Sequence, residues 1–135
     1  MKSYCTNIID SKYSSVTSSF IAMPYAIIPA GSGSVINPYL ISNFGNLIWI
    51  SQNTIAWSGK YFEQTADITC YYSQLLNAGE GFSPIGNGSP TFSGSYNGNN
   101  YKITNLVIGA SNRKSKTYVG LFGYTNKAIL RNITI

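Results

Sequence analysis

The amino-acid sequence predicts an all-β protein in which short parallel strands stack as the coils of a solenoid. The segments NYKITNLVI (Asn100–Ile108) and KAILRNITI (Lys127–Ile135) repeat one pattern of alternating apolar residues, 27 residues apart. Gly, Pro and Asn punctuate the sequence from Gly79 onward, and 10% of the residues are charged against about 25% in ordinary soluble domains. A repeat of this size, made of short strands between turns, indicates coils that share one apolar core.

The chain is expected to open with an arm over residues 1–34, followed by one domain over residues 35–135. The arm is rich in Ser, Thr and Tyr and ends in the flexible stretch PAGSGS. We expect it to be extended and held mainly by contacts with partners. Its apolar run FIAMPYAIIPAG starts late for a secretory signal and contains two prolines, and no segment reaches the roughly 18 apolar residues of a membrane span.

A short capping helix is expected at the start of the domain, after the strand PYLIS. Ser42 or Asn43 can cap a helix over residues 43–52, where apolar residues recur at helical spacing. Gly45 disfavours this helix, and a strand over residues 46–50 is the alternative. As a helix, the segment would cover the open end of the stacked coils.

The next segment, KYFEQTADITC, is predicted to be a half-buried strand because its apolar and polar residues alternate. Its inward face would include a glutamine, Gln64, which needs hydrogen-bond partners if it is buried. The inward residues are expected to be Phe62, Gln64, Ala66, Ile68 and Cys70.

The composition predicts no metal site and no cofactor. There is no histidine and no CxxC pair, so a zinc site of the usual kind lacks ligands. Cys5 and Cys70 allow one disulfide, which the sequence does not establish, and Cys70 suits a small core position. The net charge is +5, but its one cluster, NRKSK (residues 112–116), is interpreted as a solvated loop tip, which excludes nucleic acid as the main partner.

The closing segment YVGLFGYTNKAILRNITI resembles the GLUG-motif repeat, in which a Gly-Leu-Phe/Val-Gly element precedes an Ile-x-Asn strand. The preceding FSPIG and TFSGSYNGNNYKITNLVI are similar to the segment that leads into such a repeat. The resemblance covers residues 36–135 and implies a right-handed parallel β-helix of the kind found in bacterial surface proteins and viral structural proteins. No catalytic residue belongs to this motif. One such unit is present, and the pattern is incomplete at its C-terminal end.

The carboxylates argue against an enzyme. The four in the chain are Asp10, Glu63, Asp67 and Glu80. Glu63 and Asp67 share a strand face, but four residues of strand separate them by about 13 Å, beyond the spacing that glycoside hydrolysis uses. We therefore expect a non-enzymatic structural or attachment protein, on a virion in preference to a bacterial surface. The alternative is a carbohydrate-binding or polysaccharide-degrading protein.

Two groups of residues are candidates for contacts with partners. Aromatic rings could stack on a surface glycan or meet a protein, and these are Trp57, Tyr61, Tyr71 and Tyr72. The last strand would leave an unpaired edge that further coils or another subunit could cover. Its residues are Ile129, Arg131, Ile133 and Ile135. The arm and this edge predict protein partners and a larger assembly.

Overall fold

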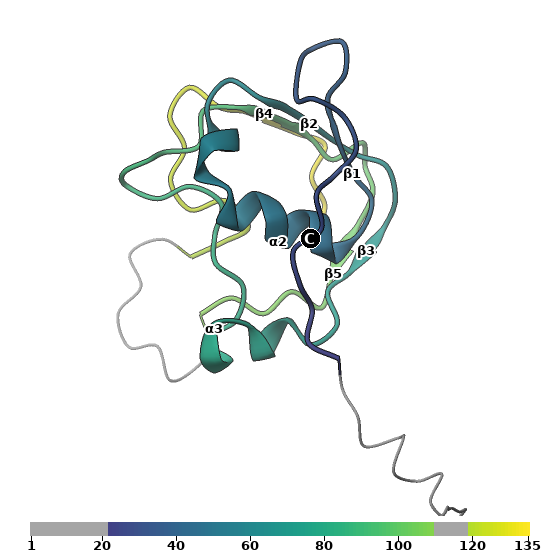
Figure 1. Ribbon diagram of the computed structural model, residues 1–135, viewed down its shortest axis with the longest axis vertical. Helices are drawn as coiled ribbons and strands as arrows, with labels where there is room; N and C mark the ends of the chain where they lie inside the picture. The colour runs from purple at the N-terminus through teal and green to yellow at the C-terminus, as the bar shows by residue number, and fades with distance from the viewer. Residues whose placement is uncertain (1–21, 110–118) are drawn as a thin grey trace, which may run out of the picture.

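A computed structural model of the chain describes residues 22–109 and 119–135, and its architecture is mixed α/β (Figure 1). The strands contain two to four residues each, and two helices and two short 3-10 turns lie between them. In chain order the elements are β1 (Tyr39–Ile41), α2 (Phe44–Gln52), η3 (Thr54–Trp57), β2 (Tyr61–Gln64), β3 (Ile68–Thr69), η4 (Ser73–Leu75), α3 (Leu76–Gly79), β4 (Ser95–Asn97), β5 (Ile103–Thr104) and β6 (Ile129–Arg131).

The strands form two small sheets, and every strand pair within them is parallel. The larger sheet has the order β1-β2-β4-β6, and the smaller pairs β3 with β5. In the larger sheet Phe62 pairs with Tyr96, which in turn pairs with Leu130. Because side chains alternate along a strand, this register sends one row of residues inward and the neighbouring rows outward.

Helix α2 forms as the sequence predicts, and the alternative strand over residues 46–50 is wrong. The Asn43 side chain accepts a hydrogen bond from the Asn46 backbone amide at 3.0 Å, which caps the first turn. The apolar side chains of α2 then enter the core; Leu47 and Ile50 are fully buried. In Figure 1, β1, β2 and β4 gather on one side of α2, and α3 lies beyond its other side.

A run of aromatic rings crosses the core along the inner face of the larger sheet, among buried aliphatic side chains. Phe62 stacks against Phe92 with ring centroids 5.9 Å apart, and Phe92 contacts Phe122 at 5.1 Å. The Tyr96 ring meets Phe122 edge-on at 5.4 Å. Such pairs add about 0.5–1.5 kcal/mol each to the free energy gained by burying their area.

Four of the five predicted inward residues of the segment from Phe62 to Cys70 are buried, including its glutamine, whereas Ala66 is half-buried. The prediction of one continuous strand is wrong, because the segment forms β2 and β3 in different sheets. Gln64 is fully buried, and its amide nitrogen donates to the backbone oxygens of Ala66 and Lys102. Its side-chain oxygen accepts from the Tyr96 hydroxyl at 3.2 Å. The buried amide therefore has partners for both of its ends, as burial of a polar group requires.

The prediction of an all-β, right-handed parallel β-helix is wrong. The strands are short, the sheets are small and separate, and α2 is a substantial part of the core. The 27-residue repeat placed Ile103 and Leu130 at equivalent positions, yet Ile103 lies in β5 of the smaller sheet and Leu130 in β6 of the larger. The repeat instead reflects a shared turn, because the asparagines that follow these strands, Asn105 and Asn132, both have a left-handed backbone.

The expectation that partners hold the arm is also wrong for the described part of it, residues 22–34. The Ile27 amide donates to the Gly45 oxygen at 2.9 Å, and the Asn46 side chain donates to the Ile27 oxygen at the same distance. Ala30 bridges to Leu40. This part of the arm therefore packs against the beginning of α2 in its own chain, where an added Cβ on Gly45 would lie 2.5 Å from Ile27.

Three expectations fall on residues outside the described ranges. These are the first 21 residues of the arm, Cys5 with its candidate disulfide, and the basic cluster within residues 112–116. Cys70, for its part, is buried with a free thiol. Within residues 22–109 and 119–135, no helix is both long and apolar enough to span a bilayer.

Candidate functional site

The outer face of the larger sheet carries the candidate site. Its two rows of outward side chains cross β2, β4 and β6, and the strand register sets their order. One row places Ser95 between Tyr61 and Ile129; the other places Asn97 between Glu63 and Arg131. Neighbouring strands lie about 4.8 Å apart, so each row is a short ladder of side chains from residues far apart in sequence.

Two adjoining hollows lie on this face, one of about 70 Å³ and one of about 200 Å³. Tyr61, Ser95 and Ile129 line both of them. Both are smaller than the roughly 300–1,000 Å³ of typical small-molecule pockets. This geometry suits a surface that meets other molecules along its length better than an enclosed reaction site.

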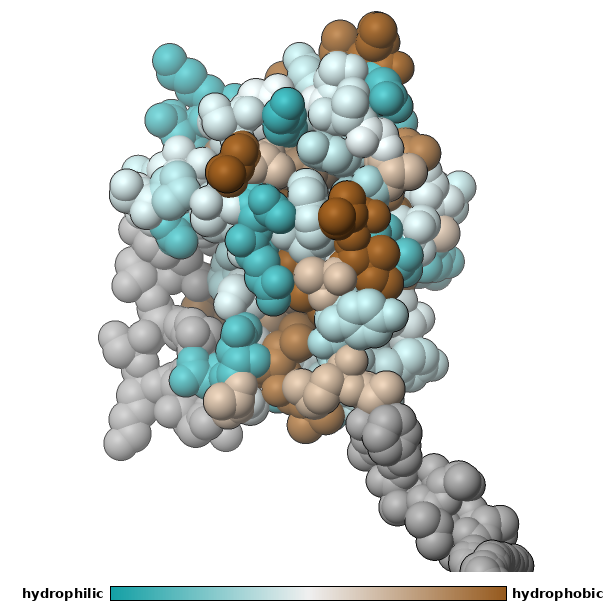
Figure 2. All heavy atoms as spheres, in the orientation of Figure 1, coloured by the Kyte–Doolittle hydropathy of each residue, from teal (hydrophilic) through white to brown (hydrophobic). Residues whose placement is uncertain are grey.

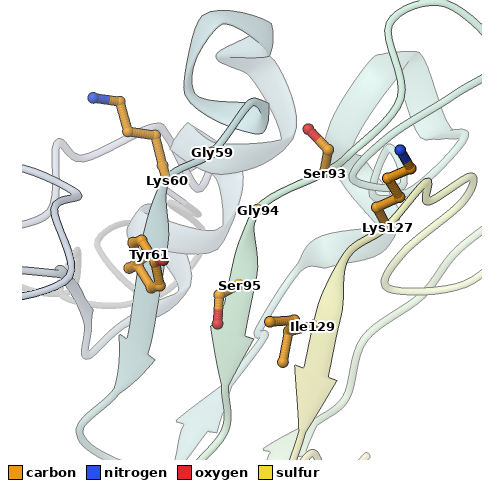
Figure 3. Close-up of a pocket in the computed structure, with 8 residues that line it drawn as sticks. All are labelled: Gly59, Lys60, Tyr61, Ser93, Gly94, Ser95, Lys127 and Ile129. Atoms are coloured by element: carbon orange, nitrogen blue, oxygen red, sulfur yellow. The ribbon is translucent and has the colours of Figure 1, made fainter.

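The smaller hollow is flanked by two lysines, Lys60 and Lys127, and Ser93 adds a hydroxyl (Figure 3). Figure 3 shows the two ammonium groups on opposite sides of the hollow, where they do not converge on one point. The face as a whole carries three cations and one carboxylate, since Arg131 and Glu63 line the larger hollow. It is positively charged without forming a cradle for an anion.

The four aromatic candidates do not form one surface. Trp57 is 2% exposed, and its indole N–H donates to the Ile50 oxygen at 2.7 Å, so it is a core residue. Tyr61 lies on the outer face of the larger sheet. Tyr71 and Tyr72 are exposed beside a separate hollow of about 350 Å³, with their rings 6.5 Å apart. Trp57 is therefore not available for surface contacts, and contacts of the three tyrosines with a glycan or a protein stay a prediction.

The four residues predicted at the open edge are also divided. Ile129 and Arg131 lie in β6, exposed, and join Tyr61 around the hollows. Ile133 packs against the core, and Ile135 is exposed beyond it. Between them Thr134 bridges to Lys102, which lies next to the smaller sheet. No unfinished coil is present in the described residues, so the predicted assembly through a coil edge is not supported.

The sequence analysis missed Lys60, Lys127, Ser93 and Ser95. Lys60, Gly94 and Ala128 each stand directly before a strand of the larger sheet. The Ser95 amide donates to the Lys60 oxygen at 2.8 Å, and the Ile129 amide donates to the Gly94 oxygen at 3.0 Å. These positions are therefore neighbours in space, but only the pairing of the strands reveals it.

Two groups capable of chemistry, Asp67 and Cys70, are tied into the fold. Asp67 accepts a hydrogen bond from the Lys102 amide at 2.8 Å, which ties the start of β3 to β5. Burial raises the pKa of the Cys70 thiol from 9.0 to about 12, so the thiolate is not formed near neutral pH. Among the described residues, no three His, Cys, Asp or Glu side chains are placed to hold a metal ion.

Two much longer proteins contain segments similar to this chain. One, from Evansella cellulosilytica, is named as a Gly-rich membrane protein and is 34% identical over 113 residues. The other, from Haloquadratum walsbyi, is named halomucin and is 33% identical over 112 residues. The matches cover 82% and 78% of this chain but only 12% and 1% of the respective relatives. No protein-family model matches the chain, and no solved structure matches it.

Proposed function

We propose that this chain is a non-enzymatic structural module of a surface-associated protein. The similar segments occur in proteins named as a membrane protein and as halomucin, and they form a small part of each. That distribution suits a building block of a long polypeptide better than a complete catalyst. Between the two locations that the sequence suggests, these names favour a cell surface over a virion.

The observation that carries the proposal is the use of polar side chains to tie distant segments together, two of them buried (Gln64 and Ser73) and one exposed (Asp67). Gln64, Asp67 and Ser73 each bind backbone groups of a segment far away in the sequence. The Ser73 hydroxyl, for example, donates to the Asn105 oxygen at 2.8 Å and accepts from the Val107 amide at 2.9 Å. Side chains held in this way fix the shape of the module and are not free to act on a substrate.

The surface supports a spacer role. Figure 2 shows brown apolar side chains interrupted by white and teal polar ones across the visible face. Large single patches are what mark obligate interfaces on most soluble proteins. A spacer needs a stable core and a solvated exterior, and this chain obtains its exterior from Ser, Thr and Asn in place of charge.

We also propose that the final segment is related to the GLUG-type repeat at the level of its motif. This proposal concerns the short Gly-Leu-Phe-Gly element and the strand after it, and it does not extend to a β-helix. In support of it, Leu121 is buried and Phe122 contacts two core rings, so the element supplies core residues, as the motif implies.

The experiment follows the full-length protein in its source organism, with an antibody against this chain. Protease added to intact cells should remove the epitope, while a cytoplasmic marker survives until the cells are lysed. A protected epitope would contradict surface location. In parallel, the purified chain is incubated with polysaccharides and newly formed reducing ends are measured; none are expected. Cleavage that disappears in Glu63→Gln, with unchanged thermal unfolding, would contradict the non-enzymatic proposal.

A further inference from the structure

The chain contains two Asn-Gly steps, Asn87-Gly88 and Asn97-Gly98, and the structure places them in opposite environments. An Asn-Gly step is chemically labile, because the amide nitrogen of the glycine can attack the side-chain carbonyl carbon of the asparagine. Glycine has no Cβ to obstruct this approach and has wide backbone freedom. The reaction requires that the glycine nitrogen be free to move toward that carbon.

Both asparagine side chains fold back over the peptide that follows, so this local turn does not distinguish the steps. The Asn87 side-chain oxygen accepts from the Ser89 amide at 3.2 Å, and that of Asn97 accepts from the Asn99 amide at 3.1 Å. Both are Asx turns, in which the side chain folds back over the following peptide. Any difference in reactivity must therefore come from the glycines and from the wider surroundings.

The first step lies in an exposed loop. Asn87, Gly88 and Ser89 are all exposed, and the loop is closed by the Asn87 amide donating to the Pro90 oxygen at 3.1 Å. Within the described part of the chain, the Gly88 amide donates no hydrogen bond. The loop begins and ends near the fully buried residues Ile85 and Phe92, so its base is fixed while its tip is exposed.

The second step is locked into the larger sheet. Asn97 ends β4 and pairs with Arg131 of β6, and its side-chain oxygen also accepts from the Asn132 side chain at 3.0 Å. Gly98 is buried, and its amide donates to the Arg131 oxygen at 2.9 Å. A Cβ at Gly98 would lie 2.3 Å from the backbone carbonyl oxygen of Asn132, so the two backbones pack too closely to admit a side chain there.

We propose that Asn87 is a site of spontaneous modification, at which the amide converts to aspartate and isoaspartate while Asn97 is protected. The Gly88 nitrogen loses its proton to hydroxide and bonds to the side-chain carbon of Asn87; the C–N bond of the amide breaks and ammonia leaves. Water then opens the resulting succinimide at either carbonyl. The net reaction consumes one water, releases one ammonia and involves no oxidation or reduction.

This inference goes beyond the proposed structural role, because it assigns to the surface of the module a slow chemical change that increases with the age of the protein. Each conversion adds one carboxylate at the loop tip and lowers the net charge of +5 by one. The isoaspartate product also inserts an extra backbone atom between residues 87 and 88. A long-lived surface protein would therefore accumulate negative charge at this loop and not in its sheet.

The test incubates the folded chain in mildly alkaline buffer and follows both steps by peptide mapping with mass spectrometry. Conversion at Asn87 should be at least about tenfold faster than at Asn97, since an opening free energy of only about 1.4 kcal/mol at Gly98 gives that ratio. In denaturant the two rates should approach each other, because the protection of Asn97 depends on the fold.

A matched variant, Gly88→Ala, separates chemistry from exposure. The φ angle of Gly88 lies outside the left-handed region, so the backbone conformation itself does not disfavour alanine. The variant should retain its circular dichroism, lose most of the conversion at Asn87 and leave the rate at Asn97 unchanged. Equal native rates at the two steps would overturn the proposal. So would a rate at Asn87 no higher than that of Asn53, which does not precede glycine.

Discussion

The two faces of the larger sheet come from the same strands, yet their side chains differ in burial and in hydrogen bonding. The inner face holds Phe62 and Tyr96, which are 1% and 0% exposed, and its polar atoms are paired. The outer face holds Tyr61 and Ile129, which are 38% and 57% exposed, beside shallow hollows. Residues next to each other in sequence therefore have different roles. A substitution on the inner face should change stability, and one on the outer face should change the surface.

The largest expected effect comes from removing one inner ring. Phe62→Ala should lower the free energy of unfolding by about 3–5 kcal/mol, because it leaves a cavity between Tyr39 and Phe92. Tyr61→Ala is the matched control, one residue away on the outer face, and should cost well under half as much. Urea denaturation followed by tryptophan fluorescence measures both. Equal losses would show that the two faces are not energetically distinct.

The buried glutamine should give the next largest effect. Gln64→Leu keeps the side-chain volume but leaves the Tyr96 hydroxyl without its acceptor, so about 1–3 kcal/mol of stability should be lost. The double variant Gln64→Leu with Tyr96→Phe removes both members of that pair and should recover part of the loss. Strictly additive losses in the double variant would contradict this assignment of the hydrogen bond.

Alkaline pH should destabilise the fold through two buried groups of the core. Burial raises the pKa of Cys70 from 9.0 to about 12, and it raises the pKa of Tyr96 still further, with the Cys70 charge as a second cause. Below about pH 9 the folded and unfolded states keep these protons, so neither group changes the stability. As the pH rises from there toward 12, the unfolded chain releases its protons first, and the free energy of unfolding falls.

The slope should be at most about 1.4 kcal/mol per pH unit for each group. Denaturant unfolding at a series of pH values measures it, and Cys70→Ala is the control, since it removes one of the two groups. That variant should have a shallower decline than the unaltered chain. An identical decline in both would mean that Cys70 does not couple folding to pH.

The sequence predicted which side chains are buried better than it predicted which strands pair with one another. The alternation from Phe62 to Cys70 and the helix capped by Asn43 depend on local spacing, and both are present. Which strand pairs with which depends on the path of the intervening chain, and the period-two pattern does not encode it. The asparagines Asn105 and Asn132 look equivalent because each occupies a left-handed turn, although the strands before them belong to different sheets.

The candidate site shows the same limit. The sequence predicts Trp57 as a ring that contacts partners. In the structure its indole N–H donates to the backbone oxygen of Ile50, near the end of α2, and this contact exists only in the folded chain. Lys60 and Lys127 flank one hollow only because β4 lies between β2 and β6. The sequence therefore predicts poorly whether a given aromatic side chain is exposed when its burial depends on a hydrogen bond that forms only in the folded chain.

The smallest expected effect tests whether the outer face contributes to stability at all. Glu63→Gln combined with Arg131→Gln removes one charge of each sign and leaves the net charge at +5. Asn97 lies between the two residues in the strand register, and exposed charges at such separation contribute little in water. The double variant should therefore unfold within about 0.5 kcal/mol of the unaltered chain, at low and at high salt. A loss above about 1 kcal/mol that disappears in high salt would mean that the outer row is an electrostatic network on which the fold depends. In that case both faces of the sheet would stabilise the fold, and they would differ only in how much free energy each contributes.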